Sequence, residues 1–159
     1  MATRIASADL QELTALIARG RWIRYDSFIA PAVLRGRFDV LHFYCLQDDD
    51  DDAGIDAAVL AAGQAQQVLH QSAQSLAGLQ PAHPLIFDLC LDLFNRADGY
   101  FESDLWSDEE VNAFLQTCRP LIESACLVTI SLSFGCSGSR ADTRRLAELV
   151  VPQIVDWRA

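Results

Sequence analysis

The sequence predicts an α/β fold in three α/β/α layers with a mostly parallel sheet. Short apolar stretches typical of strands alternate with amphipathic stretches typical of helices, and 51% of the 159 residues are hydrophobic while 21% are charged. Strands that alternate with helices form βαβ units, whose helices cover both faces of a parallel sheet. Because no internal repeat and no interdomain linker is visible, we expect one domain over residues 1–159.

The chain is expected to begin with a helix that Ser7 caps, that runs to about Arg19 and that ends at Gly20. Its apolar face is predicted to contain Leu10, Leu13, Leu16 and Ile17.

Residues 21–38 then indicate a short strand, a turn and a short helix before Gly36, and residues 38–46 indicate a buried strand. The five aspartates at 48–52 predict an exposed loop at the start of a helix. A calcium-binding loop is excluded there, because Leu60 stands where that loop needs a bidentate glutamate. From Ile55, apolar residues at helical spacing predict one long helix that ends near Gly78 and Pro81.

In the second half, residues 84–94 and 126–134 predict two further strands. Ser107 and Glu110 form a capping box for a helix that reaches about Ser124, with Pro120 expected to bend or break it. A tight turn at 135–139 and a last helix from about Arg140 complete the chain, with buried positions expected at Leu146, Leu149, Val150, Ile154 and Trp157.

The stretch PLIFDLCLDLF at 84–94 carries the most informative polar residues. Side chains alternate faces along a strand, so Asp88, Cys90 and Asp92 are expected on one face and the leucines between them on the other. Carboxylates at this spacing can bind one divalent metal ion or bridge two. The alternative is that these aspartates only cap turns and helix starts.

Polar rows are also predicted on two other strands. Thr129, Ser131 and Ser133 share one face of the later strand, and His42 and Tyr44 share one face of the earlier strand. These rows could converge on one pocket at the carboxyl ends of the strands, or simply satisfy neighbouring backbone groups. The turn GCSGS departs from the nucleophile elbow, since Ser139 replaces its second glycine, and is interpreted as a plain turn or an anion site.

Composition excludes several classes of function. The formal net charge of −10 argues against nucleic-acid binding, and the absence of lysine excludes a Schiff-base or P-loop lysine. No apolar run is long enough to span a membrane. The five cysteines contain no CxxC pair, and no secretory signal is recognised, so we expect reduced thiols in the cytoplasm.

Three stretches resemble, in the same order, motifs of the ureohydrolase-like proteins of arginase type that include the peptide arginases. RWIRYDSFIAPAVLRGRFDVLHFY is similar to a Trp-Ile-x-Pro-Ala-x-x-x-Gly segment and the following strand, and IFDLCLDLF to Asp-x-Asp/Cys-x-Asp-x-Phe. VTISLSFGCSGSRADTRRLAELV is similar to a Thr-Ile-Ala-x-Ser-Pro-Glu-x-x-Gly-Gly strand, turn and helix. The similarity spans about residues 20–157 and covers the C-terminal part of that fold, without its first strand or strands.

The resemblance implies a metal centre, usually manganese, whose bound hydroxide attacks the guanidinium carbon of an arginine to release urea and ornithine. Asp88 and Cys90 would be metal ligands, and Asp92 would be a further ligand or would support the ligands. Ser133 and Ser137 would contact a small-molecule or peptide guanidinium substrate. A homo-oligomer is also possible on this basis.

Several departures from the family motifs predict an incomplete metal site. An earlier histidine and an Asp-x-His-x-Asp motif would lie before Met1, and Phe134 and Gly135 replace the usual Pro-Glu. The soft thiol of Cys90 favours zinc or iron over manganese, or no metal. The competing hypothesis is a non-catalytic binding protein that retains the fold.

Overall fold

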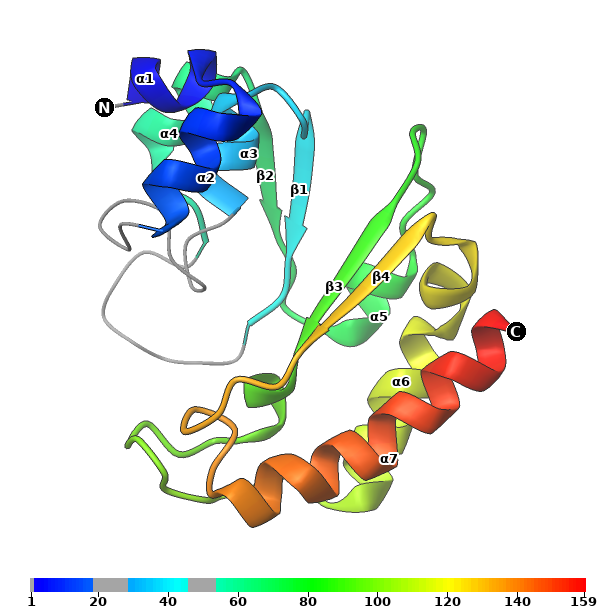
Figure 1. Cartoon of the computed structure of the whole chain (residues 1–159). Coiled ribbons are helices and arrows are strands. Elements are labelled where there is room, and N and C mark those ends of the chain that lie inside the picture. The colour runs from blue at the N-terminus through cyan, green and yellow to red at the C-terminus, as the bar shows by residue number, and fades with distance from the viewer. Residues whose placement is uncertain (1, 19–28, 46–53) are drawn as a thin grey trace. The chain divides into compact units, whose positions relative to one another are not determined.

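The computed structural model describes residues 2–18, 29–45 and 54–159. Two compact units are distinguished along the chain, Met1–Phe43 with Asp49–Leu69, and Tyr44–Asp48 with His70–Ala159 (Figure 1). The single domain expected from the sequence stays a prediction. In the described residues the architecture is mixed α/β, and both strand pairs are parallel, as predicted.

The first unit begins with two short helices in place of the single one predicted. Helix α1 covers Ala2–Ser7 and α2 covers Leu10–Ala18. The expected cap at Ser7 is wrong: its hydroxyl donates to the carbonyl of Thr3, whereas Asp9 Oδ1 accepts the Glu12 amide at 2.8 Å. Asp9 therefore starts a second helix, because an aspartate side chain can satisfy an amide that the first turn leaves without a partner.

The predicted apolar face of this N-terminal segment is only partly buried. Leu16 packs with Ile5 in a small core, while Leu10 is 79% exposed and Ile17 is 55% exposed. The guanidinium of Arg35 donates to the carbonyls of Ile5 and Ala8, at 3.1 and 2.5 Å. Arg35 follows helix α3 (Ile29–Leu34), the short helix expected before Gly36.

The long helix predicted from Ile55 is wrong. The structure has α4 (Ala57–Gly63), strand β2 (Gln66–Leu69) and α5 (Ala73–Ala77), and α5 belongs to the second unit. Asp56 caps α4, and Gln64 ends it with φ of 55°. The segment Gln66–Leu69 is extended because it pairs in parallel with β1 (Val40–Phe43), a tertiary contact that helical spacing of apolar residues cannot reveal.

The second unit is built around β3 (Ile86–Cys90) and β4 (Leu127–Ser131), a parallel pair in which Asp88 lies opposite Thr129. Both strands are shorter than predicted. A 3₁₀ turn, η1 (Leu91–Phe94), follows β3 and places Leu91 and Phe94 fully in the core.

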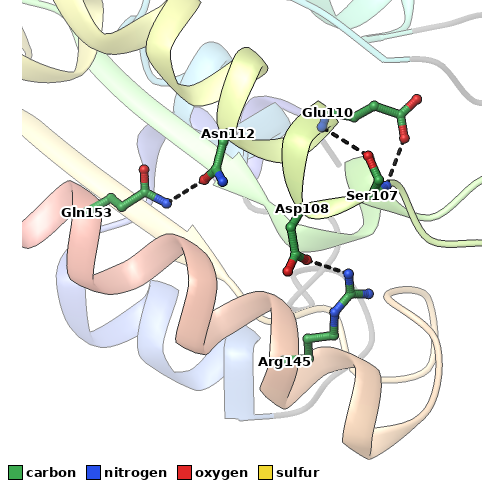
Figure 2. A network of polar contacts seen from close by, with 6 residues as sticks. All are labelled: Ser107, Asp108, Glu110, Asn112, Arg145 and Gln153. Atoms are coloured by element: carbon green, nitrogen blue, oxygen red, sulfur yellow. Dashed lines mark hydrogen bonds and ion pairs between the residues drawn. The ribbon is translucent and has the colours of Figure 1, made fainter.

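Two long helices pack against one face of this strand pair. Helix α6 (Asp108–Ser124) begins with the predicted Ser107–Glu110 capping box and continues through Pro120 without a break, and α7 (Arg140–Arg158) begins with a second capping box, Ser139 with Asp142. Figure 2 shows two contacts that join these helices, Arg145 with Asp108 and Gln153 Nε2 with Asn112 Oδ1 at 2.8 Å.

The core of this unit lies between the helices and one face of the strand pair. Phe87 and Leu89 are buried in it, Val128 and Ile130 pack against it, and the ring of Tyr44 stacks on Phe114 with centroids 5.8 Å apart. Helical residues supply most of the rest, including Val111, Leu115, Ile122, Leu146, Val150 and Ile154. The opposite face of the strands contains Ile86, Asp88, Leu127, Thr129 and Ser131, which are all exposed.

Within the described part of the chain, no helix combines the length and apolar character that a bilayer crossing requires.

Candidate functional site

The expected polar face of β3 is present up to Cys90. Asp88 is exposed and Cys90 half-buried on one face, while Phe87 and Leu89 are buried on the other. Asp92 lies beyond the strand, in η1, where the Asn95 amide donates to its carbonyl at 2.9 Å. The alternation of side chains between the two faces therefore does not continue to Asp92, because a 3₁₀ turn begins at Leu91 and buries both Leu91 and Phe94.

The parallel register brings polar residues of β3 and β4 side by side on one face of the strand pair. Cys90 lies opposite Ser131, and Asp88 accepts a hydrogen bond from the Thr129 hydroxyl. The Ser133 hydroxyl donates to Ser131 Oγ at 3.4 Å. We call Asp88, Cys90, Asp92, Ser131 and Ser133 the strand-end cluster. Polar residues of these two strands therefore meet, whereas the convergence of three polar rows on one pocket stays a prediction.

Two groups of the strand-end cluster, the Cys90 thiol and the Asp92 carboxyl, have raised pKa values. Burial raises the pKa of the Cys90 thiol, and the carboxylates of Asp92 and Asp88 raise it further, against hydrogen bonds from Ser133 and Ser131 that lower it. Burial also raises the pKa of Asp92, and Asp88 adds to this, while the Leu93 amide and Ser133 hydroxyl lower it. No cation offsets these effects, since neither Asp88 nor Asp92 pairs with an arginine in the described parts of the chain.

The donors of the strand-end cluster do not fit a manganese centre by themselves. Across residues 2–18, 29–45 and 54–159, no group of three or more His, Cys, Asp or Glu side chains is placed to hold a metal ion. A thiol with a raised pKa is a poor ligand, because metals bind the thiolate. The aspartates at 48–52, expected to form an exposed loop, lie outside the described residues.

Ser137 and Ser133 occupy different environments in the turn after β4. Ser137 is fully buried, its hydroxyl donates to the carbonyls of Leu132 and Ser133, and it lies 2.7 Å from Thr143 Oγ1. The structure thus shows Ser137 supporting the turn. Ser133 is half-buried with φ of 47°, a left-handed conformation that is rare for a residue with a side chain. Substrate contact by either serine stays a prediction.

Asn95 positions the loop beside the strand-end cluster, and sequence reasoning missed this residue. Its buried amide group donates to the carbonyls of Glu102 and Cys136, at 2.9 and 2.8 Å, and its Oδ1 accepts the Asp104 amide at 2.8 Å. An asparagine directly after an apolar run is a turn signal, and that signal could have identified it.

Cys136, in the turn after β4, was not singled out either. Burial raises the pKa of its thiol and the carboxylate of Asp92 raises it further, while a hydrogen bond with Tyr100 lowers it. Cys136 therefore lies within electrostatic reach of the strand-end cluster. His42 is exposed on β1 in the first unit, so its expected place in a common pocket stays a prediction.

No family model matches the chain, and neither the curated proteins nor the solved structures contain a significant match.

Proposed function

We propose that this chain is a ureohydrolase-like protein of the arginase type, related to the peptide arginases, with an incomplete metal site. The observation that supports the proposal is the parallel β3–β4 register. It brings Asp88 beside Thr129 and Cys90 beside Ser131 on one face of the strand pair. Polar residues at the carboxyl ends of parallel strands are where α/β folds place ligand sites. The proposal includes the three-layer arginase-like sheet, a divalent metal as cofactor and a cytoplasmic location.

A second candidate function is binding of a cationic group without hydrolysis. It is favoured by the incomplete donor set: in the described residues no three or more His, Cys, Asp or Glu side chains are placed to hold a metal ion, whereas Asp88 is exposed and can accept hydrogen bonds from a guanidinium. A guanidinium carries its own positive charge, which would offset the repulsion between the two carboxylates. A hydrolytic centre, by contrast, needs a metal held by a nearly complete ligand set.

The two candidates differ in their response to arginine and arginyl peptides. We expect the purified chain to release neither urea nor ornithine when manganese is added, and we expect weak binding of methylguanidinium in calorimetric titration. Asp88→Asn should abolish that binding. The matched control is Asp156→Asn, which removes an exposed carboxylate on α7, away from the strand-end cluster.

Turnover that requires manganese and disappears in Asp88→Asn would overturn the incomplete-site proposal and establish a hydrolase. Equal binding of methylguanidinium by both variants would contradict a ligand role for the strand-end cluster. A divalent-metal titration in the same series tests the cofactor directly, and we expect only weak binding that Asp88→Asn removes.

A further inference from the structure

Three aromatic rings are exposed at the same end of the second unit as the strand-end cluster. Tyr100 is 62% exposed, Phe101 58% and Phe134 56%. Tyr100 and Phe101 meet edge to face, with ring centroids 5.1 Å apart. We call these three residues the aromatic platform. Exposed rings that cluster in this way mark interaction surfaces in soluble proteins more often than isolated exposed residues do.

Two separate segments are held together to form the aromatic platform. The Phe101 amide donates to the Gly135 carbonyl at 2.8 Å, and Asn95 ties the loop to the carbonyl of Cys136. The ring of Tyr100 lies directly on Gly135, where an added methyl group would come within 2.4 Å of a ring carbon. The platform is therefore built on a hydrogen-bonded support, and glycine is required where the ring rests.

Backbone strain is concentrated at this support. Phe101 has φ of 65° and Ser133 has φ of 47°, one on each of the two segments, although neither is glycine. A left-handed conformation is costly for a bulky residue and persists where the surrounding structure imposes it, often at binding sites. A phenylalanine kept exposed at such a position is unfavourable for folding alone.

Carboxylates outnumber arginines in the loop that contains two rings of the aromatic platform. The loop from Asn95 to Leu105 contains three exposed acids, Asp98, Glu102 and Asp104, against one arginine, and the turn from Leu132 to Ser139 contains no charged residue. That arginine, Arg96, is engaged elsewhere: it pairs with Glu110 at 2.7 Å and lies over the Trp106 ring, 5.6 Å from its centroid. Aromatic faces and carboxylates both attract cations.

We propose that the aromatic platform docks a cationic segment of a partner protein, in which arginine or lysine alternates with apolar residues. The cations would lie over the rings and near Asp98 and Glu102, and the apolar residues would cover the remaining ring surface. An anionic membrane surface fits less well, because the acids around the rings would be repelled. The inference does not depend on the proposed function, since it uses no residue of the strand-end cluster as a ligand.

The test measures binding of the full chain to short fluorescent peptides by anisotropy. One peptide alternates arginine with leucine, a second replaces arginine with lysine, and a third replaces it with glutamate. We expect binding of both cationic peptides, weakened by added salt, and no binding of the acidic peptide. Phe101→Gly should weaken binding about three- to fivefold, because it removes one exposed cation–π contact. Glycine is chosen because it adopts the positive φ of this position without strain.

Matched variants separate loss of the surface from loss of the fold. Phe134→Ala and Glu102→Gln should each weaken binding, whereas Val155→Ala and Glu148→Gln, at exposed positions of α7, should not. Melting curves identify any variant that fails to fold, and Phe101→Gly is expected to keep its melting temperature. Asp156→Asn, which removes an exposed carboxylate of α7, should also bind the peptides as the unchanged chain does.

Unchanged peptide affinity in Phe101→Gly and Phe134→Ala would overturn the proposal, as would equal binding of the acidic peptide. Binding to lipid vesicles that the same aromatic variants remove, without binding to the cationic peptides, would show a membrane surface instead. Loss of peptide binding in Asp88→Asn, with unchanged binding in Phe101→Gly and Phe134→Ala, would place the cationic site at the strand ends and contradict a separate platform.

Discussion

The hydroxyl of Thr129 donates a hydrogen bond to Asp88 across the β3–β4 pair. The two residues are direct neighbours in the parallel register and lie on the exposed face of the strands. Thr129→Val should therefore destabilise the protein by about 1 kcal/mol, the typical net value of one such hydrogen bond. Thr129→Ser retains the hydroxyl and serves as the control. Urea unfolding measures both, and a loss in Thr129→Ser without a loss in Thr129→Val would show that the β-branched methyl, not the hydrogen bond, matters.

Asp92 is expected to make stability depend on pH in an unusual direction. Its pKa is raised mainly by burial, so the folded state holds this proton more tightly than the unfolded state. The stabilising effect is complete below the ordinary carboxyl pKa and is lost as pH rises through the higher folded pKa. Asp92→Asn has no group that ionises at this position. The free energy of unfolding of the variant should therefore rise relative to that of the unchanged chain as pH increases from acidic to neutral. Thermal unfolding across that range checks the sign, and a relative gain toward low pH would contradict the burial argument.

Asn95 is expected to be the most sensitive polar residue of the loop. Asn95→Ala removes the partner of three backbone groups, those of Glu102, Asp104 and Cys136, in part-buried hydrogen bonds, and should cost about 2 to 4 kcal/mol of stability. Asn112→Ala is the control, because its side-chain oxygen accepts a single bond from Gln153 and should cost less than about 1.5 kcal/mol. Chemical denaturation provides both values. A similar cost for the two asparagines would mean that the loop is held by other contacts.

Cys118 is expected to be chemically inert in the folded protein. Burial raises its pKa to about 11, and the side chain is fully enclosed in the core. At mildly alkaline pH only about one thiol in a thousand would be a thiolate, and the thiolate is the reactive form. The exposed Cys126 should be alkylated by iodoacetamide first, and Cys118 only after unfolding. Mass spectrometry of the modified peptides gives the order, and early labelling of Cys118 would show that the core opens readily.

The sequence by itself determined the parallel α/β character, the start of the two long helices and the polar face of β3. These features depend on local chemistry: Ser107 and Ser139 can cap a helix wherever it lies, and alternation places Asp88 and Cys90 together on any strand. Only the tertiary structure decided that residues 66–69 form a strand, because the partner that makes them extended is β1.

Tertiary structure also decided the composition of the strand-end cluster. Asp92 leaves the strand because Leu91 and Phe94 are buried by a 3₁₀ turn, and Ser137 turns inward because Thr143 and two carbonyls satisfy its hydroxyl. The hydrogen bond from Asn95 to the Cys136 carbonyl joins segments 41 residues apart in the sequence. The energies of these interactions arise from contacts that exist only after the chain has folded, and local sequence patterns contain no record of them.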